Sequence, residues 1–390
     1  MKKVNRMDTI TTDTNMLEKV HRLALDNQIA FASYKLPDEP EAVTIIQWKN
    51  QPATISEITS LEDKSGFVFA PFDPDSGNPI RLIEPDLVMK GNKFDDKDFR
   101  FDLMLAENTF LKIKSHRVSS IEPHAINMKE YMHQVDELRK MIGESVLDKV
   151  VLSRISVEKK PGDFNPTLLF EKLQEAYPEA FVFMTYIADA GLWFGASPEP
   201  LMIMKDQKIT TVSLAGTRVF EPDEAKKSWG EKELREQEIV TEYIDNILKK
   251  SGVKKYSKEG PVSHRAGNVE HLKTSFGFAV EELNGNPLPF VNKLHPTPSV
   301  CGLPKEMALD VIKRIEKHKR EYYTGFLGPV NFENKWHLFV NLRSMKVAEN
   351  QLYYYLGAGI TSGSDPYNEW EETQNKKNTL QNIVLSLNRE

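Results

Sequence analysis

Carboxylate side chains recur at helical spacing near the C-terminus of this 390-residue chain. In residues 356–377, LGAGITSGSDPYNEWEETQNKK, a glycine-rich turn leads into a helix that opens with three glutamates. One face of that helix is predicted to carry Glu369, Glu372, Lys376, Leu380, Ile383 and Leu387. Because burying charges without partners is costly, this face indicates a site for a metal ion or a charged ligand. Asp365 and Pro366 also make an ordinary helix start, which glutamates in the first turn stabilise.

A second acidic helix is predicted over residues 229–250, after the capping-box sequence at residues 228–231. Its apolar stripe extends back by four and then three residues to Glu236 and Glu233. A solvated face would explain either helix taken alone. Two helices that each direct a Glu-x-x-Glu pair inward favour a shared cation site.

Carboxylate oxygens without clustered His or Cys are ligands that suit Mg²⁺. We therefore predict Mg²⁺ held chiefly by Glu236 and Glu372. Glu233 and Glu369 are expected nearby, as water-mediated or supporting partners. Zinc is not expected, because the nine histidines show no HxxxH spacing and the single cysteine allows no CxxC motif.

Composition limits the class of protein. Hydrophobic residues make up 40% of the chain and charged residues 28%, as in globular proteins. The net charge of −6 and the lack of a basic run argue against a nucleic-acid partner. No segment has the length of a signal peptide core or a membrane span. We therefore expect a cytoplasmic protein with no membrane contact and, since Cys301 is the only cysteine, no internal disulfide.

The elements that must position the acidic helices follow from hydrophobic periodicity and turn residues. Helices are predicted over residues 16–28, 125–147, 166–177, 229–250, 269–283 and 305–317 and at the C-terminus, and a surface loop over 90–100. Strands are predicted over residues 30–35, 43–48, 67–70, 149–157, 181–187, 192–196, 201–205, 208–214, 325–332, 336–347 and 351–357. Strand meanders separated by helices predict antiparallel sheets with helices packed outside, in one large α+β domain.

Several segments together resemble one family, the chorismate-utilising enzymes, and within it most closely the isochorismate synthases. These segments are DKVVLSR (148–154), FGASPEPLM (194–202), LAGTR (214–218), EKELREQEIV (231–240), HLKT (271–274), LHPTPSVCGLPK (294–305), REYYTGFLG (320–328), NLRSM (341–345) and GAGITSGSDPYNEWEETQNK (357–376). The resemblance implies the chorismate-binding fold of anthranilate synthase component I, an α/β sandwich of two stacked antiparallel β-sheets flanked by outer helices. It also implies a single domain over residues 1–390, with a divergent N-terminal part (1–120) and a motif-bearing catalytic part (121–390).

The resemblance further implies a reaction. An isochorismate synthase, of the type that serves menaquinone or siderophore biosynthesis, uses Mg²⁺ and adds water at C2 of chorismate while the C4 hydroxyl leaves. Lys149 matches the general base and Glu199 the general acid. Glu236 and Glu372 match the Mg²⁺ ligands. Residues that match substrate contacts are Gly216, Thr217, His271, Tyr323, Arg343, Gly357, Gly359 and Lys376. His271, expected on the helix over 269–283, is also explained as a core histidine.

Related enzymes of the family leave alternatives open. Aminodeoxychorismate synthases carry a lysine where this chain has Ala215, and no glutaminase segment is fused, so no glutaminase subunit is expected. A salicylate synthase, which goes on to eliminate pyruvate, shares the acid, base and metal residues. A non-catalytic Mg²⁺-dependent binding protein on the same fold is the remaining alternative.

Overall fold

Antiparallel strands form two sheets in the described part of the chain, residues 16–94, 122–144, 147–220, 228–266 and 269–387 of a computed structural model. The first sheet has ten strands, in the order β15 (Gly302–Leu303), β8 (Lys149–Lys159), β19 (Gln351–Ile360), β18 (Ser344–Val347), β10 (Gly191–Ser197), β9 (Phe181–Ile187), β1 (Ala30–Lys35), β2 (Val43–Gln47), β6 (Leu87–Lys90) and β7 (Lys93–Phe94). The second has nine, in the order β13 (Ser257–Ala266), β14 (Val269–Ala279), β12 (Lys208–Val219), β11 (Pro200–Lys205), β17 (Trp336–Val340), β16 (Phe326–Val330), β4 (Gly66–Ala70), β5 (Ile80–Ile83) and β3 (Ala53–Ile55).

Aromatic side chains fill the space between the two sheets. Phe181 of β9 stacks on Phe339 of β17 with ring centroids 4.3 Å apart, and Tyr34 of β1 meets Phe67 of β4 at 5.5 Å. Such rings bury large apolar areas and fix the spacing of the layers. The predicted α+β fold with stacked antiparallel sheets is confirmed.

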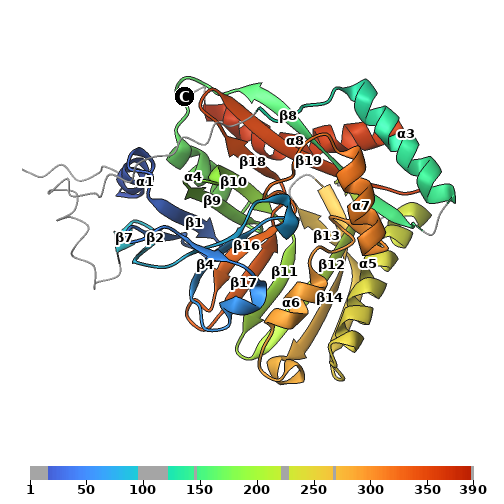
Figure 1. The fold of residues 1–390 in the computed structure, drawn as a ribbon, viewed down its shortest axis with the longest axis horizontal. Coiled ribbons are helices and arrows are strands. Elements are labelled where there is room, and N and C mark those ends of the chain that lie inside the picture. Colours follow the sequence, from blue (N-terminus) through green and yellow to red (C-terminus); the bar gives the residue numbers. More distant parts are fainter. Residues whose placement is uncertain (1–15, 95–121, 145–146, 221–227, 267–268, 388–390) are drawn as a thin grey trace, which may run out of the picture.

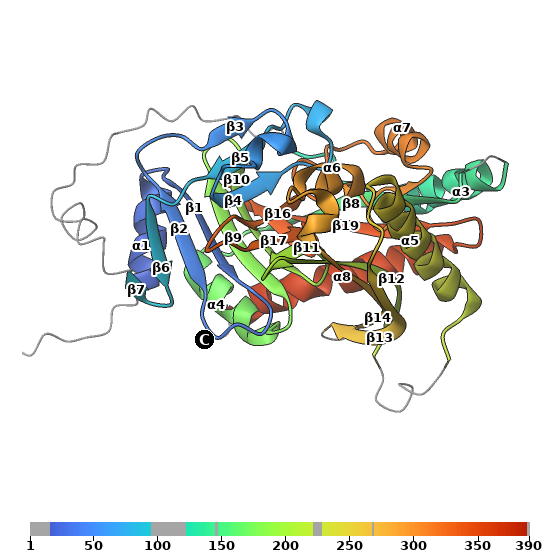
Figure 2. The ribbon, with the colours of Figure 1, turned by 90° about the horizontal axis from the view of Figure 1, so that it is seen from below.

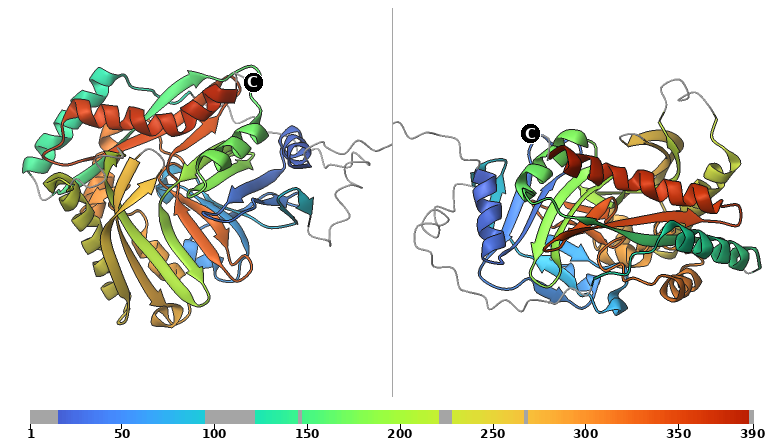
Figure 3. Two further views of the ribbon diagram at one scale, coloured as in Figure 1. Left: turned by 180° about the vertical axis from the view of Figure 1, so that it is seen from behind. Right: turned by 90° about the horizontal axis from the view of Figure 1, so that it is seen from above.

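Helices cover the outer faces of the sheets (Figure 1). These are α1 (Met16–Asp26), α3 (Met128–Glu144), α4 (Pro166–Ala176), α5 (Glu231–Lys250), α6 (Leu288–Leu294), α7 (Lys305–Ile315) and α8 (Pro366–Leu387). Helix α8 crosses the first sheet beside α3 and α4 (Figure 3) and buries Leu380 and Val384. Helix α5 packs Val240 and Ile244 against β12 and β14 of the second sheet. The two acidic helices therefore cover different sheets.

Two of the places where the chain crosses from one sheet to the other are neighbours. Pro198 and Glu199 connect β10 in the first sheet to β11 in the second. Residues 341–343 connect β17 in the second sheet to β18 in the first. The crossings lie side by side, since Ala196 N donates to Arg343 O at 3.1 Å and Val340 N donates to Glu199 O at 2.9 Å. Proline lacks the N–H that would continue a ladder, which explains one of the breaks.

The first 94 residues supply strands to both sheets. Strands β1, β2, β6 and β7 extend the first sheet beyond β9, and β4, β5 and β3 extend the second beyond β16. Figure 2 shows β1, β2, β6 and β7 together with α1 at one edge of the molecule. The N-terminal part therefore completes the two layers that the rest of the chain begins.

The predicted helix over residues 269–283 is wrong. Val269–Ala279 is strand β14, which pairs with β12 and β13, and only Val280–Leu283 forms a 3-10 turn. The residues Leu272, Thr274, Phe276 and Phe278 are buried in alternation, which is the period of a strand. His271 consequently lies on a strand.

Three boundaries also differ from prediction. The strand predicted over residues 336–347 is divided by the crossing at 341–343. Helix α5 begins at Glu231 with Gly230 as N-cap, so the Ser228 capping box does not form. The predicted loop over 90–100 contains strand β7 at Lys93–Phe94, and its residues 95–100 lie outside the described chain. No described helix is both long and apolar enough to cross a membrane.

Candidate active site

A small cavity of about 80 Å³ lies where the two crossings meet the ends of β8 and β19. Most of the predicted site residues line it: Lys149, Glu199, Gly216, Glu236, His271, Tyr323, Arg343, Gly357, Gly359, Glu372 and Lys376. They come from both sheets and from both acidic helices. Residues up to 227 positions apart, from Lys149 to Lys376, therefore converge on one space.

Lys149, the predicted base, opens strand β8 and is only 1% exposed. Its Nζ lies 2.7 Å from Oε1 of Glu236 on α5. A Cβ atom added at Gly359, on the neighbouring strand β19, would lie 2.8 Å from both Lys149 Cε and Glu236 Oε1. Glycine at position 359 thus leaves the room that the Lys149–Glu236 ion pair occupies.

Glu199, the predicted acid, is buried in the crossing between β10 and β11, with 5% of its surface exposed. Burial raises its pKa to about 7, although a hydrogen bond from Ser299 and the charges of Lys149 and other cations act in the opposite direction. Ser299 Oγ donates to Glu199 Oε1 at 2.6 Å. A carboxyl with this pKa can carry a proton near neutral pH, as a general acid requires.

Glu236 and Glu372, the predicted metal ligands, both line the cavity and each pairs with a lysine. Lys376 Nζ lies 2.5 Å from Glu372 Oε1, one turn along α8, and donates to Gly357 O at 2.8 Å. Two carboxylates that each attract an ammonium group create a region where positive charge is favoured.

Glu233 and Glu369, the predicted supporting acids, are not among the residues that line the cavity. A Cβ added at Gly230 would lie 2.5 Å from Glu233 Oε2, so this carboxylate lies against the N-terminal end of its own helix. Glu369 is 1% exposed and lies in the first turn of α8. In these positions, both carboxylates complement the helix dipoles.

Arg343 and Tyr323 face the cavity from the second crossing and from the segment before β16. Burial lowers the pKa of Arg343, while Tyr323, Glu372 and Glu199 nearby act to raise it. Burial also raises the pKa of Tyr323 to about 12. Gly357 permits the approach of the phenol, because a Cβ there would lie 3.0 Å from Tyr323 Oη.

Two non-glycine residues that line the cavity have a left-handed backbone conformation. Arg343 has φ 47° and Thr324, which also lines the cavity, has φ 59°. A β-branched residue such as threonine rarely adopts this left-handed conformation. Strained non-glycine residues persist where the surroundings fix them and are common at functional sites.

Gly216, Thr217 and His271 lie where β12 bulges. The register between β12 and β14 shifts between Ala215 and Thr217, and Gly216 has φ +67°. His271 Nδ1 lies 3.2 Å from Gly216 O, and Thr217 is opposite His271 in the ladder. Burial lowers the pKa of His271 to about 3, so its ring is neutral at pH 7. The hydroxyl contact expected from Thr217 stays a prediction.

Ser299 and Thr324 were missed by reasoning from the sequence. Each lines the cavity, and Ser299 contacts Glu199 directly. The proline pair around Thr297 and Ser299, in HPTPS, was a usable signal, because prolines fix a polar loop in one shape. Nothing in the local sequence around Thr324 indicates its strained backbone.

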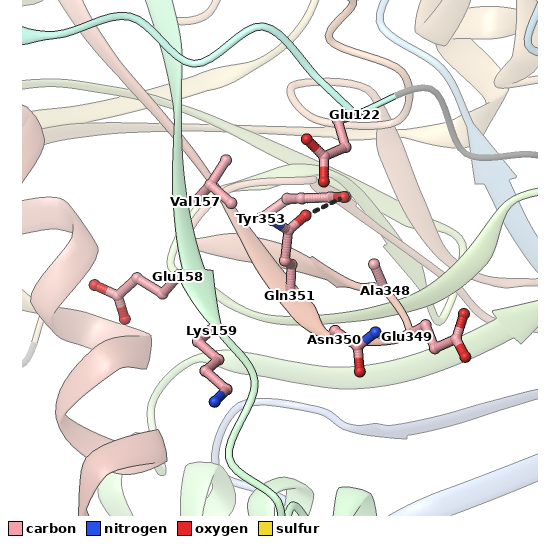
Figure 4. Close-up of a pocket in the computed structure, with 9 residues that line it drawn as sticks. All are labelled: Glu122, Val157, Glu158, Lys159, Ala348, Glu349, Asn350, Gln351 and Tyr353. Atoms are coloured by element: carbon pink, nitrogen blue, oxygen red, sulfur yellow. Dashed lines mark hydrogen bonds between the residues drawn. The ribbon is translucent and has the colours of Figure 1, made fainter.

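A larger groove of about 520 Å³ lies at the opposite ends of β8 and β19 (Figure 4). It is on the order of 30 Å along β8 from Lys149, at the usual rise of a strand. Two of its carboxylates, Glu122 and Glu349, are exposed, and Tyr353 donates to Gln351 within it. The smaller cavity is the better candidate, because buried charged side chains from several segments converge on it.

Comparison with known proteins agrees with this site. Residues 97–385 match the chorismate-binding enzymes. The chain is 30% identical over 279 residues to isochorismate synthase EntC of Escherichia coli (strain K12), covering 69% of this chain and 71% of EntC. It is 28% identical over 336 residues to isochorismate synthase MenF of the same organism, covering 80% of this chain and 76% of MenF.

Solved structures show the same fold. The menaquinone-specific isochorismate synthase MenF from Escherichia coli superimposes with a TM-score of 0.73 at 23% identity, covering 96% of this chain and 92% of MenF. Anthranilate synthase component I from Streptococcus pneumoniae TIGR4 gives 0.66 at 18% identity, covering 97% and 95%. The chain belongs to the chorismate-binding enzyme family. Within that family, EntC and MenF, the two relatives described above, are both isochorismate synthases.

Proposed function

We propose that this protein is an isochorismate synthase, which converts chorismate reversibly to isochorismate. The observation that supports this most directly is that a buried lysine, Lys149, and a buried glutamate that can hold a proton, Glu199, line the same cavity. The similarity to EntC and MenF supports the same reaction.

In the proposed reaction, Lys149 acts in its neutral amine form and takes a proton from a water molecule as the oxygen of that water bonds to C2 of the ring. Glu199 gives a proton to the C4 hydroxyl as the C4–O bond breaks, and that oxygen leaves as water. One water enters and one leaves, so the product is an isomer of the substrate. Lys149 opens strand β8 of the first sheet and Glu199 lies in the crossing from β10 to β11, so the base and the acid reach the cavity from different segments, which suits groups that act on different ring carbons.

The other residues of the cavity would orient the substrate. Arg343 and Tyr323 are proposed to bind the enolpyruvyl carboxylate, since arginine can hold a carboxylate with two hydrogen bonds. Gly216, Thr217 and Lys376 are proposed to contact the ring carboxylate, and Gly357 and Gly359 to leave room for the ring. His271, neutral and hydrogen-bonded to Gly216, would support that wall of the cavity.

The donor set fits Mg²⁺. Within the described residues no cluster of three or more metal-binding side chains is present. Two carboxylates are nevertheless sufficient, because Mg²⁺ usually keeps several waters and takes oxygens from the substrate. Glu236 and Glu372 would hold the ion, which would supply Lewis-acid stabilisation of the ring carboxylate. Glu233, which lies against the start of its own helix, and Glu369, which is buried in the first turn of α8, remain proposed as outer partners only.

The direct test is incubation of the purified protein with chorismate and Mg²⁺, followed by chromatographic separation of the products. We expect isochorismate without salicylate, and no change when glutamine or ammonium is added. Lys149→Met serves as the inactive control. Salicylate and pyruvate as products would instead establish a salicylate synthase, and unchanged chorismate with measurable binding would establish a binding protein.

We also propose that residues 1–390 form a single domain, because residues of the N-terminal 94 contribute strands to both sheets. The cytoplasmic location expected from the sequence stays a prediction.

A further inference from the structure

Arg320, in the segment after α7, does not line the cavity but is bonded to three of the segments that do. It is 5% exposed and lies over the ring of Phe72 at 4.3 Å. Its hydrogen bonds go to Glu316 Oε2 (2.9 Å), Glu316 Oε1 (2.6 Å), Val300 O (2.8 Å), Thr324 Oγ1 (3.2 Å) and Val151 O (2.6 Å). A guanidinium group has five N–H donors, so every one of them is used.

The hydrogen bond from Arg320 to Val151 fixes the strand that carries the base Lys149. Val151 is two residues beyond Lys149 on β8, and its carbonyl accepts from Arg320 Nη2. Glu316, the ion-pair partner, accepts from Ser153 N on the same strand at 2.7 Å. The Glu316–Arg320 pair therefore holds β8 at two points just beyond Lys149.

The hydrogen bond from Arg320 to Val300 fixes the loop that holds the acid Glu199. Val300 O accepts from Arg320 Nη1, and Val300 follows Ser299, which donates to Glu199. Ser299 Oγ also lies 2.6 Å from Thr297 Oγ1, so the hydroxyl is held on both sides. The position of the Glu199 carboxyl thus depends on a loop that Arg320 ties down.

The hydrogen bond from Arg320 to Thr324 fixes the segment that carries Tyr323 and forms one wall of the cavity. Thr324 Oγ1 accepts from Arg320 Nη1, and Thr324 N donates to Asn341 O at 2.8 Å. These bonds hold Thr324 at its unfavourable φ of 59°. The neighbouring Tyr323 is thereby kept against the cavity.

The ion pair itself is buried and permanently charged. Burial alone would raise the pKa of Glu316, but Arg320 and the hydrogen bonds to Glu316 hold that pKa below its usual value. A buried ion pair seldom adds net stability over an apolar replacement, because both charges lose their hydration. Its three backbone and hydroxyl contacts, by contrast, define a geometry that an apolar residue cannot define.

We propose that Arg320, oriented by Glu316, is a positioning residue that sets the relative placement of the base Lys149, the acid Glu199 and the wall carrying Tyr323. This role rests on the proposed function, since it concerns the acid and base of that reaction. Misplacement of reacting groups by about 1 Å can slow an enzyme roughly 100-fold, so the role predicts a loss of turnover rather than of substrate binding.

The test compares Arg320→Lys and Arg320→Ala with the wild-type protein. Lysine keeps the charge but cannot bridge Val151 O, Val300 O and Glu316 together. We expect kcat to fall roughly 100-fold in both, with KM changed by less than about threefold, and guanidinium ion to restore part of the kcat of Arg320→Ala but not of Arg320→Lys. Arg81→Ala is the matched control, because Arg81 also pairs with an acid, Asp189, and with Thr54, away from the cavity. It should lower the melting temperature without changing kcat or responding to guanidinium.

The outcomes separate the two hypotheses. If the wild-type protein turns over chorismate and the Arg320 variants keep near-normal kcat, or lose it without guanidinium rescue, the positioning role is wrong and the proposed function stands. If the wild-type protein does not turn over chorismate, both fall. If the Arg320 variants fail to fold, the test uses Ser299→Ala, which removes only the hydrogen bond from Ser299 to Glu199. An unchanged kcat in that variant overturns the proposal. A several-fold loss of kcat at an unchanged melting temperature supports it.

Discussion

Glu199 combines two properties that seldom occur together at one residue: it is almost fully buried, and three cations contribute to its field. Burial outweighs those charges, so its pKa rises from 4.5 to about 7. Lys149, one of those cations, has its own carboxylate partner in Glu236. The acid and the base are therefore kept apart by separate partners instead of neutralising each other.

The protonation of Glu199 predicts an alkaline limit to activity. As a general acid Glu199 must be protonated, and its protonated fraction falls above pH 7. We expect kcat/KM to decline tenfold per pH unit on the alkaline side, with an apparent pKa near 7 in the free enzyme. The measurement is kcat/KM against pH from 5 to 9. A profile that is flat between pH 7 and 9 would remove Glu199 from the role of acid.

Stability should depend on pH through the same group. Its folded pKa is raised, so between pH 4.5 and about 7 the folded state binds more protons than the unfolded state. Stability is therefore lost as pH rises through that window, by about 3 kcal/mol at most from the 1.36 kcal/mol per pKa unit of linkage. Glu199→Gln, which cannot ionise, should be more stable than the wild-type protein at pH 8 and nearly equal to it at pH 4.5. Buried histidines such as His21, with a pKa of about 3, act equally in both proteins and cancel. A difference in denaturant midpoint that does not change with pH would contradict the shift.

Metal binding is also decided at the residue scale. If Glu372 is a ligand, Mg²⁺ should raise the melting temperature of the wild-type protein, because a ligand that binds only the folded state stabilises it. Glu372→Gln keeps the shape but weakens the charge, and should lose most of that increase. Glu371→Gln, a neighbouring glutamate on α8 that does not line the cavity, is the control. Equal Mg²⁺-induced shifts in all three proteins would exclude Glu372 as a ligand.

The sequence identified the charged members of the site better than the neutral ones. Glu372 could be predicted because a charge within an apolar pattern needs an explanation, and Lys149 because its segment resembles the family. Thr324 could not, because a hydroxyl is unremarkable in any loop and its importance comes from neighbours distant in sequence. Ser299 was missed although the prolines before it were a usable signal. Glu233 and Glu369 had the correct spacing, but helix periodicity alone does not distinguish a carboxylate that lines the cavity from a neighbouring one that does not.

At the scale of elements, the site depends on strands that stop in the right place. Periodicity predicted most strands and both acidic helices, since each has one apolar face. It could not predict that β17 and β18 belong to different sheets, because the apolar alternation continues from residue 336 through Leu342, past the end of β17. It also took β14 for a helix, since the polar Thr274 occupies one of the buried positions and interrupts the apolar alternation in the sequence.

Strand β19 offers an element-scale test of the close packing around the Lys149–Glu236 ion pair. The Cβ of Gly359→Ala would lie 2.8 Å from Glu236 Oε1 and Lys149 Cε, which are flexible side-chain ends. We expect the fold to survive but the pair to be displaced, with kcat lowered at least about tenfold, as for other small misplacements of catalytic groups. Gly363→Ala lies in the same glycine-rich segment with open space around it and should retain normal kcat. If the two variants behave alike, close packing at Gly359 does not govern turnover.

At the scale of the whole molecule, the motifs lie after residue 147, yet both sheets are built partly from residues before 95. Removing the N-terminal part would leave β9 without its partner β1 and β16 without its partner β4. It would also remove Phe31, Tyr34, Phe67 and Phe69, which are buried. Exposed strand edges and uncovered apolar surface promote aggregation.

We therefore expect residues 122–390 expressed alone to aggregate or to form an expanded state, although they carry every predicted site residue. The measurements are size-exclusion chromatography, and near-ultraviolet circular dichroism for fixed aromatic packing. A chain that begins at Met16 is the control, because it keeps every described strand and should unfold in one cooperative transition. A monomeric, cooperatively unfolding 122–390 fragment would instead show that the motif-bearing part is a domain by itself. In that case the N-terminal strands would be an addition to the catalytic unit, and the proposal of one domain would be wrong.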